Sequence, residues 1–199
     1  MFGLFKRKLS PKNRAYIIAK NTSDYIGSLD ETVNRFIQQN PKFNDKRNNI
    51  IDELQWIIAT GGLISIRIIS DHKKTKATYE QLIEFYHALH LSNNNNSTFN
   101  SDYLEKLKTK FDNYLVRFNR GIVFRDQNEN SYNEALIDVA NESMKYFTGE
   151  IRHSQIKDLD DIDKLQERTE PSELELFVKD ILNQFIKIFM KEFEQTKFI

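Results

Sequence analysis

The segment that most constrains the fold is the run at residues 50–69, IIDELQWIIATGGLISIRII, the longest apolar-rich stretch of a largely polar chain. Its apolar residues recur in steps of three and four, so that two neighbouring rows form one broad apolar face of a helix. Asp52, Glu53 and Thr60 fall outside those rows, which predicts that the other side of the helix reaches water. Charged residues interrupt the run too early for a membrane span, which needs about 20 apolar residues.

Gly61 and Gly62 lie in the middle of this run, where two glycines cost a helix about 2 kcal/mol relative to alanine. Both lie on the apolar face, so their missing side chains predict the close approach of a second helix. We expect that helix to be the one that follows Ser172, with its phenylalanines packed onto the glycines. The alternative is that the helix ends at Thr60 and that residues 63–70 form a strand, because apolar and polar residues alternate there.

Composition favours an all-α fold in a single domain that spans residues 1–199. The chain has only six glycines and three prolines, so it has few breaks, and its many Leu, Ile, Lys, Glu and Gln residues suit helices. Apolar periodicity predicts a bundle of six or seven helices around the long central apolar helix. The expected helices lie near residues 11–21, 28–40, 44–70, 78–91, 101–120, 131–149 and 172–196.

Three capping boxes, in which a Ser or Thr is followed three residues later by Glu or Gln, predict helix starts at Ser28, Thr78 and Ser172. Pro41 is expected to end the second helix, and Gly121 the fifth. Residues 92–100 are rich in Asn and Ser and have little to bury, which predicts a polar loop.

Charge and cysteine content exclude several classes. The 29 basic residues balance 29 acidic ones, which argues against nucleic-acid binding by the chain as a whole. The absence of cysteine excludes disulfides, thiolate zinc sites and cysteine nucleophiles. The start of the chain does not have the pattern of a secretory signal, so we expect a cytoplasmic location.

Residues 1–9 form a basic amphipathic N-terminal segment, in which Phe2, Phe5 and Leu9 would share one side of a helical turn. A basic amphipathic segment can lie on an anionic membrane surface. This predicts a membrane contact through Phe2, Phe5, Lys6, Arg7 and Lys8 and makes peripheral membrane association one alternative function.

Residues 158–175 are rich in acids and have few cations to neutralise them. Too few apolar residues occur here for a core helix, so we expect this strip to be exposed. It could contact the basic N-terminal half of its own chain, but we expect it to contact a basic protein partner. The predicted protein-binding residues are Asp158, Asp160, Asp161, Asp163 and Glu167.

Two Glu-x-x-His pairs, Glu84 with His87 and Glu150 with His153, have the spacing found in ferritin-like di-metal carboxylate enzymes. On a helical wheel, however, Glu84 lies nearly opposite the apolar stripe, and the second pair follows Gly149, where a helix is expected to end. We therefore predict no metal site and no cofactor. Phosphate-binding loops and hydrolase elbows are also absent from the sequence. The sequence thus predicts a non-enzymatic helical protein-binding or regulatory module, with the membrane-associated protein and the di-metal enzyme as alternatives.

Overall fold

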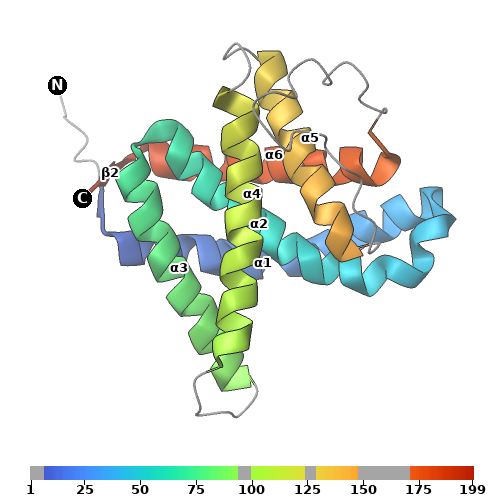
Figure 1. Cartoon of the computed structure of the whole chain (residues 1–199), viewed down its shortest axis with the longest axis horizontal. Coiled ribbons are helices and arrows are strands. Elements are labelled where there is room, and N and C mark those ends of the chain that lie inside the picture. Colours follow the sequence, from blue (N-terminus) through green and yellow to red (C-terminus); the bar gives the residue numbers. More distant parts are fainter. Residues whose placement is uncertain (1–6, 94–99, 124–128, 148–170) are drawn as a thin grey trace.

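The computed structural model describes residues 7–93, 100–123, 129–147 and 171–199, and most of these residues lie in helices (Figure 1). The prediction of an all-α fold is confirmed to that extent. The helices of the described residues are α1 (Pro11–Gln39), the short 3₁₀ helix η1 (Pro41–Lys46), α2 (Arg47–Ile69), α3 (His72–Asn93), α4 (Ser101–Val123), α5 (Glu129–Phe147) and α6 (Glu173–Glu194). None of them carries an apolar stretch long enough to cross a bilayer.

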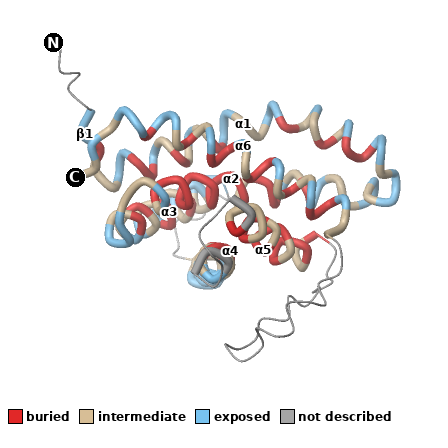
Figure 2. Tube along the Cα trace, turned by 90° about the horizontal axis from the view of Figure 1, so that it is seen from above, coloured by how far each residue is buried: buried red, intermediate tan, exposed pale blue. Residues whose placement is uncertain are grey.

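Helix α2 lies between two layers of the structure, with α1 and α6 on one side and α4 and α5 on the other (Figure 2). Every residue from Ile57 to Ile66 is buried. The prediction that one side of this helix reaches water is therefore wrong for Thr60, which is fully buried, and for Glu53, which is only 4% exposed. Asp52, nearer the start of the helix, is exposed as predicted. The helix also continues without a break to Ile69, so the strand alternative for residues 63–70 is wrong.

The two glycines of α2 face different helices. A Cβ atom on Gly61 would lie 3.3 Å from Leu182 Cδ1 and 3.5 Å from Ile186 Cγ1, both on α6. A Cβ atom on Gly62 would lie only 2.7 Å from Cγ1 of Ile18, on α1. Close approach at the glycines is thus observed, but aliphatic side chains of two helices, rather than phenylalanines of α6, fill the space.

Two of the predicted capping boxes do not start helices. Helix α1 runs through Ser28, whose hydroxyl donates to the Tyr25 carbonyl one turn earlier (2.7 Å). Thr78 lies inside α3 and its hydroxyl donates to the Lys74 carbonyl (2.8 Å). Hydroxyl side chains can bond to the preceding turn as readily as they cap, so the four-residue pattern is ambiguous.

The third capping box is confirmed at the start of α6. The Glu175 amide donates to Ser172 Oγ (3.3 Å), and the Ser172 amide donates to Glu175 Oε2 (2.7 Å). Gly121 does not end its helix, because α4 continues to Val123. Helix α3 extends to Asn93, so the predicted polar loop begins later than expected; residues 94–99 lie outside the described ranges.

Two short strands, β1 (Arg7–Leu9) and β2 (Thr196–Phe198), pair in parallel and bring the two ends of the described chain together (Figure 1). The register places Lys8 beside Lys197 and Leu9 beside Phe198. Leu9 is fully buried. The predicted helical turn is therefore wrong for residues 7–9, because extended backbone here gains hydrogen bonds to β2.

Candidate interaction surfaces

The paired strands are anchored by Arg14, a fully buried residue of the first turns of α1. Its Nε donates to Thr78 Oγ1 (2.7 Å) on α3. Its other nitrogens donate to carbonyl oxygens of three segments: Leu9 (2.9 Å), Ile199 (3.3 Å) and Lys74 (3.3 Å). The guanidinium also lies over the Phe198 ring, 4.9 Å from its centroid. One side chain thus joins β1, β2, α1 and α3.

Arg14 is bound mainly by neutral groups. Burial lowers the pKa of the guanidinium, and the charge of Asp71 opposes that shift. Five N–H donors in a fixed plane suit several carbonyls at once, which a lysine could not match. Asp71 also accepts a hydrogen bond from the Lys74 amide (2.8 Å), which caps the start of α3.

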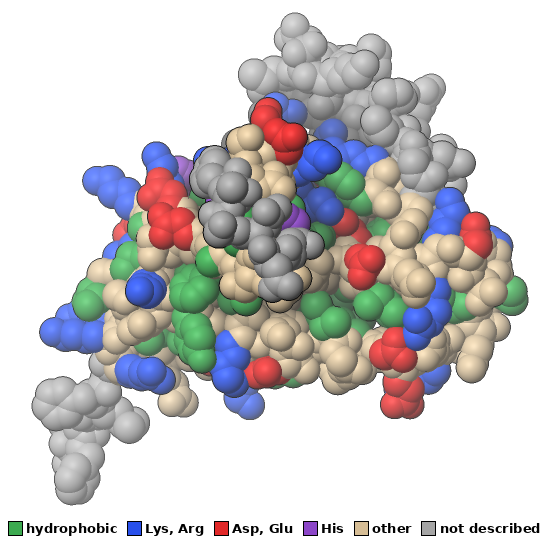
Figure 3. All heavy atoms as spheres, turned by 90° about the horizontal axis from the view of Figure 1, so that it is seen from below, with side chains coloured by type: hydrophobic (Ala, Val, Ile, Leu, Met, Phe, Trp, Pro, Cys, Tyr) green, Lys and Arg blue, Asp and Glu red, His purple; other side chains and the backbone are tan. Residues whose placement is uncertain are grey.

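Exposed cations surround this anchored end. Of the predicted membrane-contact residues, Arg7 and Lys8 are exposed on β1, and Phe2, Phe5 and Lys6 lie outside the described residues. Figure 3 shows several Lys and Arg side chains projecting at the left end of the molecule, with Asp and Glu side chains among them. We call this set the basic end; its members are Arg7, Lys8, Lys12, Lys73, Lys76 and Lys197, all of them exposed.

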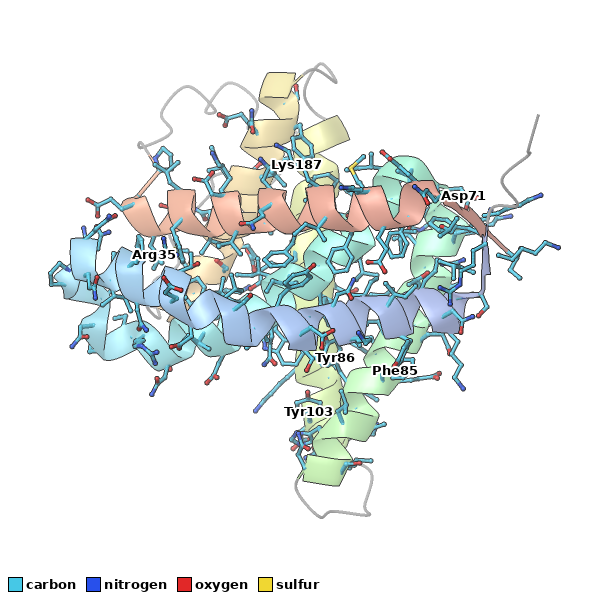
Figure 4. The ribbon with its side chains drawn as sticks, turned by 180° about the vertical axis from the view of Figure 1, so that it is seen from behind. Arg35, Asp71, Phe85, Tyr86, Tyr103 and Lys187 are labelled. Atoms are coloured by element: carbon cyan, nitrogen blue, oxygen red, sulfur yellow. The ribbon has the colours of Figure 1, made fainter. Side chains whose placement is uncertain are left out.

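A group of exposed apolar side chains lies where α1 crosses α3. Tyr16 of α1 is 53% exposed and Leu89 of α3 is 49% exposed. Between them lies Phe85, which is half-buried and whose ring centroid is 6.1 Å from that of Tyr16 (Figure 4). These three residues form what we call the aromatic patch.

A buried ionic cluster joins α2 to α4 on another side of the molecule. Glu53 Oε2 lies 2.5 Å from Lys110 Nζ, and Glu53 Oε1 accepts from the Tyr114 hydroxyl (2.5 Å). Burial raises the pKa of Glu53 more than Lys110 and Tyr114 lower it, and burial together with Glu53 raises the pKa of Tyr114 well above its ordinary value. The Lys110 ammonium lies 4.3 Å from the Tyr146 ring centroid. The cluster fixes α4 and α5 to the centre of the fold.

An open cleft of about 560 Å³ lies above this cluster, lined mainly by one side of α4. Its lining combines two acids with two lysines, and Tyr146 closes one wall. The charges balance, and Lys110 is already occupied by Glu53 and Tyr146. The lining residues are Asp102, Glu105, Lys106, Thr109, Lys110 and Tyr146.

The predicted acidic strip, Asp158, Asp160, Asp161, Asp163 and Glu167, lies outside the described residues and stays a prediction. The same holds for Glu150 and His153. Glu84 is exposed and accepts a hydrogen bond from Gln81 (3.1 Å). In the part of the chain that the structure describes, there is no group of three or more His, Asp or Glu side chains that could hold a metal ion.

Few local patterns in the sequence point to the residues that organise the basic end. Arg14 stands in a basic stretch that is typical of an exposed segment. Only its place beside Ala15 and four residues before Ile18, on the buried side of α1, indicates that its side chain is buried. Lys73 and Lys76 stand in a short basic run that is typical of an exposed helix end. No local sequence pattern predicts that β2 lies near these lysines.

No protein-family model, curated protein or solved structure matches this chain.

Proposed function

We propose that the chain is a protein-binding module, a helical bundle organised around α2, whose aromatic patch receives an amphipathic helix of a partner protein. The observation that carries the proposal is the exposure of Tyr16 and Leu89 on either side of Phe85. Large aromatic and aliphatic side chains grouped at a surface are typical of binding sites, and tyrosine is enriched among the residues that dominate binding energy.

The geometry of the patch supports a helical partner. Phe85 and Leu89 are one turn apart on α3, and Tyr16 approaches Phe85 from α1, so the three side chains form a short apolar row across two helices. A partner helix with apolar residues three and four positions apart can lay them along such a row.

Charge next to the patch supports an acidic flank on that helix. Lys12 and Lys20 lie one turn before and one turn after Tyr16 on α1, and both are exposed. Lys20 pairs with Asp24 (2.9 Å), whereas no carboxylate of the described residues forms an ion pair with Lys12. Lys12 can therefore face an acidic residue of the partner, which would mainly speed association and set orientation.

Site-specific photo-crosslinking tests the proposal. A photoreactive phenylalanine analogue is placed at position 16 of the full chain in its native cell and, in a matched control, at Leu176, which is also exposed (39%) but lies on α6. We expect position 16 to give a discrete protein adduct that position 176 does not give. The proposal also requires Leu89→Ser to reduce that adduct about tenfold, since an apolar side chain of this size contributes about 1.5 kcal/mol when buried.

The same adduct from both positions, or no protein adduct from position 16, would overturn the aromatic patch as the binding site. Circular dichroism of the Leu89→Ser chain checks that the loss of adduct is not loss of fold. Because Leu89 is half exposed, we expect its replacement to leave the helical signal and melting temperature nearly unchanged.

A further inference from the structure

We infer that the basic end is a second binding site, which attaches the molecule to a membrane surface that carries acidic lipids. The site uses none of the three side chains of the aromatic patch. It shares only Lys12 with the proposed partner contact, and the variants below leave Lys12 unchanged, so the two proposals are tested separately. It is also not the amphipathic N-terminal helix that the sequence predicts. Instead it is assembled from four parts of the chain: β1, β2 and the first turns of α1 and α3.

The first support is a local excess of positive charge. No carboxylate of the described residues forms an ion pair with any member of the basic end. The exposed acids nearby include Asp71, which accepts from the Lys74 amide (2.8 Å), Glu192, which accepts from Asn21 (2.5 Å), and Glu194, two residues before β2. These acids keep their negative charge, but the six cations outnumber them. The charge of this end is thus directed outward, to whatever anionic group approaches it.

The second support is the register of the two strands. Parallel pairing places Lys8 directly beside Lys197, and both side chains are exposed. Neighbouring strands lie about 4.8 Å apart, so two ammonium groups on the same face repel each other. A phosphate or carboxylate between them would relieve that repulsion, which makes the pair a natural contact for a lipid headgroup.

The third support is the rigidity of the platform. Arg14 binds carbonyls of Leu9, Lys74 and Ile199, and Lys74 donates to the Phe198 carbonyl (3.2 Å), so the strands and α3 are held in one arrangement. Cations held by a folded scaffold bind a surface without the loss of backbone freedom that a disordered basic tail incurs.

A membrane surface fits this site better than a nucleic acid does. The elements that carry the cations, β1, β2 and the first turns of α1 and α3, lie at one end of the long axis of the molecule (Figure 1). An exposed apolar residue, Ile199 (58% exposed), follows β2 at this end. Lys and Arg around an apolar side chain are typical of proteins that lie in the membrane interface. Single-stranded nucleic acids are instead held by a basic groove with aromatic platforms, whereas the exposed apolar side chain beside these cations, Ile199, is aliphatic.

Vesicle sedimentation with the full chain tests the inference. The vesicles are phosphatidylcholine alone and phosphatidylcholine mixed in equal parts with phosphatidylserine. The test variant is Lys8→Gln, Lys73→Gln, Lys197→Gln. The control variant is Lys106→Gln, Lys108→Gln, Lys187→Gln, which removes the same charge from exposed lysines of α4 and α6. A short DNA duplex and a single-stranded RNA are measured in parallel.

We expect the natural chain to sediment with the acidic vesicles only, and to be released by added salt. The test variant should bind about 100-fold more weakly, because each lysine near an acidic surface contributes about a factor of five, whereas the control variant should lose less than about threefold. If the test and control variants lose vesicle binding equally, binding follows the net charge of the chain and not a site at the basic end, and the inference is overturned. Binding to the nucleic acids but not to the vesicles, or binding to neither, would overturn the inference.

Discussion

The centre of α2 and the basic end fix helices in opposite ways. At the centre, Gly61 and Gly62 let α6 and α1 approach within van der Waals contact, and every neighbouring residue is buried. At the basic end, one buried guanidinium holds four segments through hydrogen bonds to a hydroxyl and three carbonyls. Close packing is sensitive to any added atom, whereas a polar anchor is sensitive to any lost donor. The two regions should therefore fail under different substitutions.

The largest effect is expected at the polar anchor. Arg14→Met keeps an unbranched buried side chain but removes every donor, so the carbonyls of Leu9, Lys74 and Ile199 lose a partner. We expect a loss of about 4 kcal/mol in the free energy of unfolding by urea, since buried polar groups left unpaired cost about 1–3 kcal/mol each and part of that is recovered by water.

Arg14→Lys sharpens this prediction, because it keeps the charge but supplies fewer donors from a single point. It should recover about half of the loss. Hydrogen exchange adds a local measurement: the Ile199 amide, which donates to the Leu9 carbonyl (3.1 Å), should exchange faster in both variants. If Arg14→Met is as stable as the natural chain, the strands are not anchored by this residue.

The next largest effect is expected where α2 crosses α1. A Cβ atom on Gly62 would lie 2.7 Å from Ile18 Cγ1 and 3.0 Å from Ile18 Cγ2. Because both carbons branch from the same Cβ atom, rotation of the Ile18 side chain exchanges one close contact for another. Gly62→Leu should lower the free energy of unfolding by about 3 kcal/mol through overpacking. Gly62→Ala should lower it by about 1 kcal/mol, even though alanine favours a helix by about that amount. An alanine variant more stable than the natural chain would disprove the close contact with α1.

The contrast also explains which features were predictable. Three features were predictable because they are local patterns. The apolar rows of the central run predicted a helix, the glycines on those rows predicted a close helix crossing, and the Ser172 capping box predicted the start of α6. The burial of Glu53 depends on α4, whose Lys110 and Tyr114 bind its carboxylate although they lie far from it in the sequence. Arg14 acquires its role only because β2, at the other end of the sequence, returns beside β1. No periodicity encodes a contact of that kind.

A smaller effect is expected at Glu53, the second buried charge. Because its pKa is raised in the fold by burial, its contribution to stability is fully present below its ordinary pKa of 4.5 and is lost as pH rises through the raised value. Glu53→Gln removes this titration and keeps one acceptor for Tyr114, so at pH 7 we expect a change within about 1 kcal/mol.

The measurement is urea unfolding of both chains from pH 4 to pH 7. The stability of the natural chain minus that of Glu53→Gln should fall as the pH rises. A difference that instead grows with pH would mean that the ion pair with Lys110 outweighs burial. Glu53 would then stabilise the fold as a carboxylate, in the way that Arg14 stabilises it as a cation.

The smallest effect, and the one that separates the two glycines, is expected at Gly61. Its nearest neighbour, Leu182 Cδ1 at 3.3 Å, is the tip of a flexible side chain, and the next atoms are at 3.5 Å or more. Gly61→Ala gains about 1 kcal/mol of helix propensity and asks Leu182 to move by a few tenths of an ångström, so it should raise the free energy of unfolding by about 0.5 kcal/mol. Thermal melts of Gly61→Ala and Gly62→Ala should therefore shift in opposite directions. If the melting temperature falls in both alanine variants, α6 is packed against α2 as tightly as α1 is. If it rises in both, neither glycine is required by a crossing helix.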